Sequence, residues 1–428
     1  MRASTVTSVR ETRPLGATLA CAAAFTASWD IYGVEVVGRT IKPVLALALL
    51  AVAAWAARPV RVPNLNRRAQ LVALTVAALA GWLTLRTAFL PLSVALPALV
   101  SMLLILVATL AVVLHRPWAG QIARAFVWGM ALTSAVAIYE WAAQRVGLPR
   151  LTHYRSGLQR AAGFSYEPAY FGSSAFAAAT LCYLTWRPGQ RRTAVLCVLA
   201  AGLVTANARV VVVQAVVTGV AYWLLARRDR TARKMQRRLV RSTVVAVILL
   251  AVTMLVQPSI ASDLSQRAAS FTDRNEAQSN AIRIRLYGNV VTVIKDDLWM
   301  GPGPGMLGVK FEERAYTPDI LLQGDNGQIV ANNLLLQAIG DGGLLAAGLE
   351  LCLIVAVARC SRRRAELGAA WVGLVVGAGL TVSNFWDAEP WLLLGLILAT
   401  SSRGGRPGLG PQAVDHASVR GADHSDEG

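Results

Sequence analysis

Long apolar runs separated by shorter polar segments dominate the chain, which has 428 residues. An α-helix needs about 20 mostly apolar residues to cross a bilayer, and many of these runs approach that length. We therefore expect an all-α polytopic membrane protein with about 12 transmembrane helices and a long extracytoplasmic loop. The expected spans are 15–34, 40–57, 69–88, 91–114, 121–145, 168–186, 193–206, 210–226, 241–257, 332–358, 368–383 and 390–402.

The polar segments between these runs differ in length and charge. Lys and Arg are concentrated in every second segment, above all between residues 227 and 241, and such an excess marks cytoplasmic loops. Both termini are then cytoplasmic, and the longest polar segment faces the outer side of the cytoplasmic membrane. The expected parts are helices 1–9 within residues 1–257, the outer loop 258–331, helices 10–12 within residues 332–402, and a disordered cytoplasmic tail, 403–428.

Composition agrees with this topology. The sequence is 55% hydrophobic and 15% charged, with a mean hydropathy of +0.48, whereas soluble domains contain about 25% charged residues. The formal net charge of +18 is also a feature of nucleic-acid-binding proteins. Because the basic residues follow the expected cytoplasmic loops, topology accounts for the charge, and we expect no nucleic-acid partner.

The outer loop 258–331 contains a helix signal of its own. Within Ala281–Leu298, apolar residues recur three or four positions apart, which indicates an amphipathic helix. These residues are Ile284, Tyr287, Val291, Ile294 and Leu298. The run Gly301-Pro-Gly-Pro-Gly305 would then break the helix in a sharp turn. We expect this helix to lie along the outer membrane interface, with Trp299 at the level of the headgroups.

Four arginines on the outer side are candidates for binding a substrate, because charged side chains in or near a membrane are costly and usually have a partner. Arg160 precedes a span, Arg209 lies between two apolar runs, and Arg283 and Arg285 lie on the amphipathic helix. Guanidinium groups offer paired donors to phosphate oxygens, so arginines converging on one pocket would bind a pyrophosphate. The alternative is that each is an interface residue whose head group reaches water.

Two carboxylates lie at the outer ends of expected spans. Glu167 precedes Pro168, and Asp30 interrupts the end of the first span. A carboxylate in such a place can act as a general base. The alternative, which we favour for Asp30, is a helix cap or an ion pair with a neighbouring arginine. His153 is the only histidine in an outward segment, and no cysteine lies in one, so we expect no metal site.

Short blocks between Arg160 and Leu345 resemble the O-antigen ligase and polymerase superfamily, which are integral membrane glycosyltransferases that use polyprenyl-linked glycans. One family block reads Arg-x-x-x-Trp followed by Gly-x-Gly-x-Gly, and another reads His-Asn-x-x-Leu-Gln followed by Glu-x-Gly. The similar segments here are Arg283–Tyr287 with Leu298–Gly305, Ala331–Gln337 with Gly340–Leu345, Arg160–Pro168, and Asn207–Arg209. Tyr287 stands where the family usually has Trp.

The resemblance implies a GT-C-like fold and sugar transfer from a polyprenyl pyrophosphate to an acceptor hydroxyl, with inversion. Arg160, Arg209 and Arg283 would contact the pyrophosphate or stabilise its charge as it leaves. The donor carries a good leaving group, so the resemblance implies no metal and no cofactor. The implied partners are a lipid-linked oligosaccharide donor, a glycan acceptor and membrane lipids. The other block residues expected to bind substrate are Arg285, Tyr287, Gly303, Gly305 and Asn333.

Asn332 departs from the family pattern, because ligases usually carry histidine there. Asparagine does not act as a general base at neutral pH, although it can orient a hydroxyl. Either the base lies elsewhere, with Glu167 the first choice, or the protein is closer to the polymerase branch. Polymerisation of repeat units, or transfer to another envelope acceptor, therefore fits better than ligation to a lipid A core.

Three other functions remain open from the residues alone. A flippase of lipid-linked glycans would also bind pyrophosphate with arginines, but no duplicated halves are evident. A peptidoglycan polymerase would share the large outer loop, but its usual acidic motif is not found convincingly. A sensor or scaffold is the residual possibility.

Overall fold

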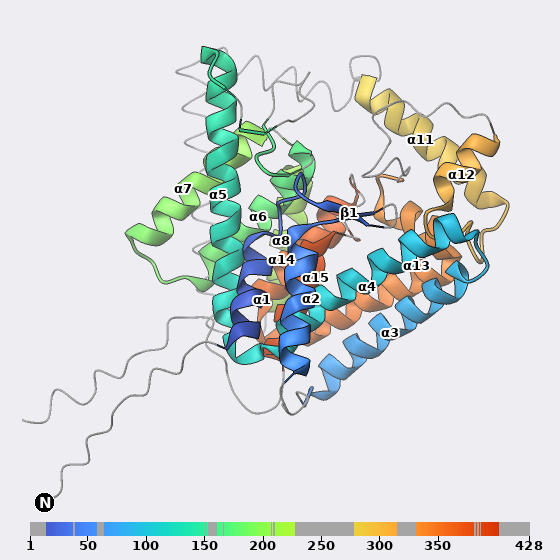
Figure 1. The fold of residues 1–428 in the computed structure, drawn as a ribbon, viewed down its shortest axis with the longest axis horizontal. Coiled ribbons are helices and arrows are strands. Elements are labelled where there is room, and N and C mark those ends of the chain that lie inside the picture. Colours follow the sequence, from blue (N-terminus) through green and yellow to red (C-terminus); the bar gives the residue numbers. More distant parts are fainter. Residues whose placement is uncertain are drawn as a thin grey trace, which may run out of the picture.

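The structure is a computed structural model, and it describes residues 14–36, 39–57, 64–149, 151–152, 161–165, 167–206, 208, 210–226, 278–314, 331–380, 382, 385 and 387–401. Within these residues it contains thirteen α-helices, a few short turns of other helix types and one two-stranded hairpin (Figure 1). The expected disordered tail, 403–428, lies outside the described residues, as does the expected span 241–257.

The elements follow one another in a helical array. In the N-terminal half they are α1 (Leu15–Phe25), β1 (Val34–Val36), β2 (Arg39–Ile41), α2 (Pro43–Ala56), α3 (Arg67–Thr87), α4 (Leu92–Leu114), η1 (Arg116–Trp118), α5 (Ala119–Val146), α6 (Pro168–Thr185), α7 (Gln190–Ala206) and α8 (Val210–Ala226). In the C-terminal half they are α11 (Gln278–Lys295), α12 (Met306–Glu313), α13 (Leu334–Cys360), η4 (Ser361–Arg363), α14 (Ala365–Val372), η5 (Gly373–Ala378) and α15 (Ala388–Thr400).

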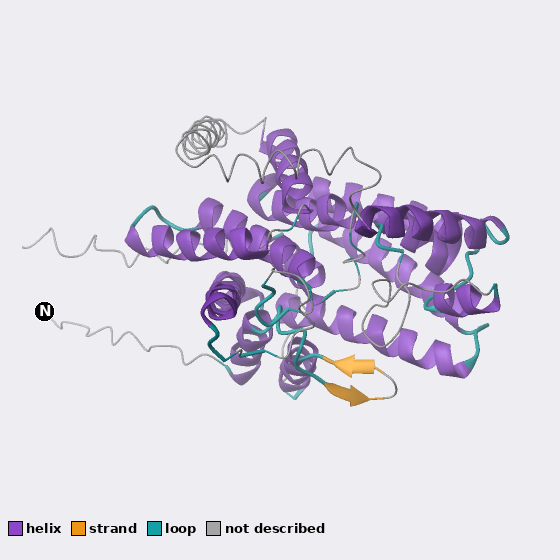
Figure 2. Ribbon diagram, turned by 90° about the horizontal axis from the view of Figure 1, so that it is seen from above, coloured by secondary structure: helices purple, strands orange, loops and turns teal. Residues whose placement is uncertain are grey.

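Helices occupy every expected span that the structure describes, with one notable difference at the first. Helix α1 ends at Phe25, and the antiparallel hairpin β1–β2 lies between it and α2. In this hairpin, only Val34-Glu-Val36 alternates apolar and polar residues, a strand signal too short for a search for long apolar runs to detect. Figure 2 shows the hairpin at the edge of the helical array.

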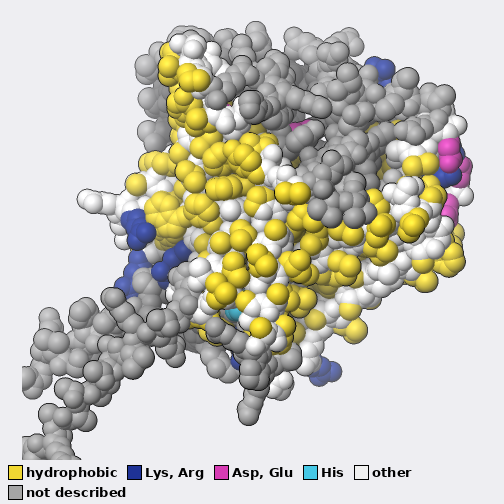
Figure 3. Space-filling model, viewed as in Figure 1, with side chains coloured by type: hydrophobic (Ala, Val, Ile, Leu, Met, Phe, Trp, Pro, Cys, Tyr) yellow, Lys and Arg dark blue, Asp and Glu magenta, His cyan; other side chains and the backbone are white. Residues whose placement is uncertain are grey.

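Among the described residues, four helices are long and apolar enough to cross a membrane: α3, α4, the continuous helix Arg116–Gln144, and α13. Five shorter apolar helices accompany them in the same part of the chain. Large apolar side chains are exposed along several of these helices, for example Leu74 at 67% and Val216 at 63%. Figure 3 shows hydrophobic side chains spread over this face of the molecule, with Lys and Arg gathered at the lower left. Such a surface suits contact with lipid.

Small residues allow the helices to approach closely. A Cβ at Gly129 of α5 would collide with the backbone of Phe25 in α1, and a Cβ at Gly202 of α7 would crowd Ser134. Membrane helices commonly pack through such residues, since lipid provides no hydrophobic force between them. The main core is correspondingly rich in alanine.

Contacts between helix ends fit helices that alternate in direction. Near the start of α3, the Asn66 amide donates to the carbonyl of Ser401 after α15, and Cys360 at the end of α13 contacts the same residue. Near the opposite end of α3, Trp82 contacts the N-terminal half of α13. Thus α3 runs opposite to α13 and α15, as the expected topology requires.

Candidate active site at the outer helix ends

The structure describes most of the residues that the sequence nominates. Arg160 and Arg209 lie outside the described residues, and Arg283 is described only as a backbone position of α11. The Arg285 side chain is exposed. The others that it describes are Glu167, Tyr287, Gly303, Gly305, Asn332 and Asn333.

Helix α11 confirms the expected helix, and the face that it buries within the protein differs from the apolar stripe that the sequence predicts to lie along the membrane interface. The buried residues are Leu286, Val290, Val293 and Ile294, whereas Val291 and Leu298 are exposed at 37% and 42%. The buried face packs against Leu307 and Phe311 of α12, and against Ala331 and the beginning of α13. The helix has apolar residues on two faces, and packing against α12 and α13 selects one of them.

Tyr287 connects α11 to the segment that precedes α13. Its hydroxyl donates to the carbonyl oxygen of Asn332 at 3.1 Å. Asn332 has a φ of 49°, in the left-handed region that asparagine tolerates better than most residues. The next residue, Asn333, accepts a hydrogen bond from the Leu336 amide at 3.2 Å and caps α13. The two asparagines therefore shape the entry into α13.

Beside this entry, a row of polar side chains runs along α13. Gln337 accepts from the Ala331 amide at 2.8 Å and donates to Asp341 at 2.9 Å. Both Gln337 and Asp341 are buried. The row fixes the backbone that leads into Asn332, although neither side chain was nominated from the sequence as a site residue.

The glycine run forms a turn, Gly301–Gly305, which we call the glycine turn. Its three glycines have φ values of 68°, 117° and 78°, so each needs the freedom that glycine gives. The turn packs into a break in α13 at Gly342 and Gly343, the α13 kink, where the backbone leaves helical geometry. The Gly303 amide donates to the Gly340 carbonyl at 3.1 Å. Gly303 is buried in this joint.

The other two sequence blocks also meet. The Ala161 amide, next in sequence to Arg160, donates to the Thr205 carbonyl at 3.3 Å. Ala208, next to Arg209, packs against the same buried cluster as Ala169 and Tyr170 at the start of α6. The blocks Arg160–Pro168 and Asn207–Arg209 therefore converge through their described residues.

A third contact brings these blocks toward α13. Val210 packs with Ala378 and Val382 near the end of η5. Close to them, the Asn333 side chain donates to the carbonyl of Leu380 at 3.4 Å. Segments from α6, α8, η5 and α13 thus meet at the helix ends that the sequence predicts to face outward, where it also predicts a donor site.

Residues 193–351, from α7 into α13, match the family model Wzy_C, described as O-antigen ligase. The family resemblance is confirmed. The match covers the positions of Arg209, Arg283, the glycine turn and Asn332, while Arg160 and Glu167 precede it. No curated protein matches the chain significantly. With its apolar helices, the protein is a helical membrane protein that carries an O-antigen ligase segment, and this family transfers lipid-linked glycans.

Glu167 lies at the entrance of α6, and it precedes the matched segment 193–351 in the sequence. It occupies the N-cap position with an extended backbone, and in the described structure its side chain makes no capping bond to that helix. Its backbone carbonyl accepts from the Phe171 amide at 3.0 Å. Glu167 is half-buried and lies near the converging blocks, and its carboxylate does not cap α6.

Asp30 belongs to a group of three charged side chains and one hydroxyl, which we call the outer charge network: Asp30, Lys42, Asp387 and Ser165. Lys42 Nζ lies 2.9 Å from Asp30 and 3.9 Å from Asp387. Ser165 donates to Asp30 at 3.0 Å. The expected ion pair of Asp30 is present, but its partner is a lysine rather than an arginine. Reasoning from sequence missed the network, because its members are far apart in the chain.

The outer charge network adjoins the block that contains Gly163 and Phe164. Phe164 packs against Trp29 and Tyr32 with ring centroids 5.0 and 5.7 Å apart, and its carbonyl accepts from the Ile31 amide at 3.2 Å. Gly163 has a φ of 58° and lies against the Thr133 backbone. The segment that follows Arg160 is thereby fixed between α1 and α5.

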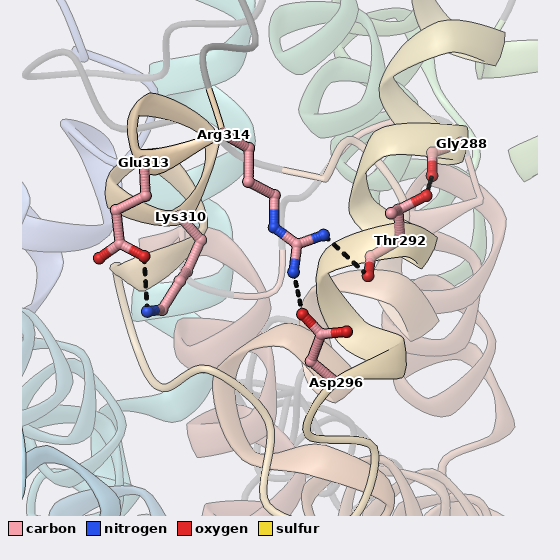
Figure 4. A network of polar contacts seen from close by, with 6 residues as sticks. All are labelled: Gly288, Thr292, Asp296, Lys310, Glu313 and Arg314. Atoms are coloured by element: carbon pink, nitrogen blue, oxygen red, sulfur yellow. Dashed lines mark hydrogen bonds and ion pairs between the residues drawn. The ribbon is translucent and has the colours of Figure 1, made fainter.

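Polar contacts also join α11 to α12 within the O-antigen ligase segment (Figure 4). Arg314 pairs with Asp296 and donates to the Thr292 carbonyl at 3.3 Å. Lys310 and Glu313 form a second pair at 2.7 Å. These groups are partly or fully exposed, and exposed pairs stabilise by about 1 kcal/mol or less. The contacts of Arg314 join the end of α12 to α11, whereas the Lys310–Glu313 pair lies within α12.

Proposed function

We propose that the protein is a metal-independent membrane glycosyltransferase that polymerises or ligates polyprenyl-pyrophosphate-linked glycans on the outer face of the cytoplasmic membrane. The observation that carries the proposal is the convergence of the separate sequence blocks at the outer helix ends. The O-antigen ligase match over 193–351 supports it independently. The proposal includes the twelve-span layout with both termini cytoplasmic, the outer loop 258–331 as a separate part, and a product destined for cell-surface polysaccharide.

The proposed reaction is a displacement at the anomeric carbon of the donor sugar. The acceptor hydroxyl forms the new glycosidic bond, the bond to the pyrophosphate breaks, and a base takes the hydroxyl proton. Charge develops on the departing pyrophosphate, where guanidinium groups stabilise it most effectively. We assign this role to Arg160, Arg209 and Arg283, with Arg285 as a further contact to the donor.

The acceptor side of the site is assigned to residues at the entries of α6 and α13. Glu167 is the proposed base, because it lies beside the converging blocks and does not cap its helix. Asn332 and Asn333 are proposed to orient the acceptor, with Tyr287 holding the Asn332 backbone. Gly303 and Gly305, which the sequence predicts to bind substrate, are proposed to support the site through the glycine turn. The absence of histidine at 332 favours polymerisation over ligation to a lipid A core.

The test is turnover by the full-length protein, purified in detergent, with a lipid-linked repeat unit. We expect longer glycans from the wild type and a loss of roughly 100-fold or more in rate for Arg209→Ala and Arg283→Ala, as when a group that stabilises developing charge is removed. Arg187→Ala is the matched control, since Arg187 is an exposed arginine at the opposite end of α6. Its rate should equal that of the wild type.

Two outcomes would count against the proposal. Transport of the lipid-linked glycan across vesicles without any elongation would favour a flippase. Full polymer length and yield from both arginine variants would show that these arginines do not act in catalysis.

A further inference from the structure

Two side chains of α3 contact the joint between the glycine turn and the α13 kink. Trp82 and Arg86 are four residues apart and therefore share one face of the helix. Trp82 Nε1 donates to the Gly342 carbonyl at 2.8 Å, and Arg86 Nη2 donates to the Gly301 carbonyl at 2.6 Å. Helix α3 lies well outside the segment that matches the O-antigen ligase family.

The kink explains why such donors are needed. A break in a helix frees backbone groups, and within or near a membrane these groups must find partners inside the protein. The Gly340 carbonyl accepts from the Gly303 amide, and the Leu344 amide donates to the Leu298 carbonyl at 3.0 Å. The Gly342 carbonyl accepts from Trp82. The broken helix thus finds its hydrogen-bond partners in the glycine turn, in Leu298 just before the turn, and in Trp82 of α3.

Arg86 is bonded more firmly to the turn than to its acidic neighbour. Its side chain is 11% exposed and its Nη2 lies 3.6 Å from Asp297, whose side chain is 46% exposed. The bond to Gly301 is shorter and joins a charged donor to a carbonyl, a strong class of hydrogen bond. Asp297 also accepts from the Met300 amide at 3.3 Å. The Gly301 carbonyl is therefore the main acceptor for Arg86.

The joint leaves little room for adjustment. A Cβ at Gly301 would collide with backbone atoms of α13, and one at Gly343 would collide with the carbonyl of Trp299. Close backbone contact of this kind transmits a displacement rather than absorbing it. The glycine turn begins a few residues after α11 ends at Lys295, so its position determines where α11 lies against α13. The position of α11 in turn determines where Tyr287 contacts Asn332.

We propose that Trp82 and Arg86 are positioning residues, which hold the glycine turn on the α13 kink and so set the place of α11 in the active site. The contacts themselves are independent of what the protein does. The consequence for catalysis rests on the proposed function, because it requires that the helix position of Arg283 be part of the donor site.

Hydrogen exchange tests the holding role without any assay of activity. In full-length protein in lipid nanodiscs, Arg86→Ala should exchange the amides of residues 286–305 at least tenfold faster, with α5 and α6 unchanged. Arg67→Ala, an exposed arginine at the other end of α3, should match the wild type. Arg86→Lys, which keeps one charged donor, should fall between. Unchanged exchange in Arg86→Ala, or faster exchange throughout the protein, would overturn the holding role.

Turnover of the lipid-linked repeat unit tests the catalytic consequence. We expect Arg86→Ala and Trp82→Phe to lower kcat, by at least tenfold for the arginine variant, while KM stays within about threefold. Partial recovery in Arg86→Lys, and a change under threefold in Asp297→Asn, would support positioning through Gly301. Wild-type turnover by Arg86→Ala would overturn it. An inactive wild type would instead contradict the proposed function, and exchange would still decide the holding role.

Discussion

At the joint, α13 and the glycine turn touch through their backbones, whereas the outer charge network ties α1, α2 and α15 together through side chains. In the described structure the joint has four inter-segment bonds to backbone carbonyls, at Gly301, Gly340, Gly342 and Leu298. The network instead centres on Lys42, which lies near two carboxylates. Both lie near the helix ends that are predicted to face outward, and both position segments that carry candidate site residues.

The two regions respond to different kinds of change. Contact between backbones requires the absence of a Cβ, so the joint depends first on which residues are glycine, and Arg86 supports it through a carbonyl rather than through a buried ion pair. A buried ion pair is sensitive to the loss of one partner, since the other charge remains buried, but both partners together can often be replaced by neutral residues. Substitutions that add volume should therefore harm the joint most, and substitutions that unbalance charge should harm the network most.

The largest effect is expected from Gly343→Ala. Gly343 has a φ of 71° and a ψ of −167°, a region nearly restricted to glycine that costs about 1–3 kcal/mol for an L-residue, and the added Cβ would collide with the Trp299 carbonyl. Overpacking adds about 1–3 kcal/mol, so we expect a loss of about 3 kcal/mol or more, seen as a lower thermal midpoint of the purified protein.

Gly348→Ala is the matched control on the same helix. Gly348 is exposed, and an added Cβ there meets no atom within 4 Å in the described structure. Alanine should stabilise the helix by about 0.5–1 kcal/mol at such a position. If the two variants melt at the same temperature, backbone contact does not hold the joint.

A smaller effect is expected from Lys42→Met. The change leaves Asp30, whose side chain is 8% exposed, without its cation. Removing one partner of a fully buried pair costs about 3–5 kcal/mol. Ser165 still donates to Asp30, so we expect a loss of about 2 kcal/mol in the same measurement.

The double variant Lys42→Met, Asp30→Asn separates charge from packing. It removes both charges while keeping side chains of similar size, so it should recover a good part of the stability lost by Lys42→Met. If the double variant is as unstable as the sum of the two single variants, the ion pair is not what joins α1 to α2.

The contrast also explains what the sequence could predict. Long apolar runs predicted the helices, because hydrophobicity over a whole span is a strong local signal. The glycine run predicted a turn after α11, because alternating glycines and prolines end a helix and allow a sharp turn locally. Lys42, Asp387 and Ser165 were not nominated, because their relation exists only once distant segments are folded together. Trp82 and Arg86 were missed for the same reason.

The buried face of α11 shows a different limit. Its sequence allows one stripe through Tyr287 and Val291 and another through Leu286, Val290 and Val293. Periodicity alone does not choose between them, and contact with Phe311 of α12 and with α13 does. The places of Arg160 and Arg209 stay a prediction, supported by the contacts of Ala161 and Ala208.

The smallest effect is expected from Tyr287→Phe, which asks how much one side chain adds where α11 approaches α13. The change removes the donor to the Asn332 carbonyl, 3.1 Å away, and keeps the ring. A hydrogen bond of this kind contributes about 1 kcal/mol, so the thermal midpoint should fall slightly. Thr292→Ala is the control, because its hydroxyl bonds only within α11, to the Gly288 carbonyl, in the described structure. A fall equal to that of the control would mean that α11 is held by the glycine turn and its apolar face alone.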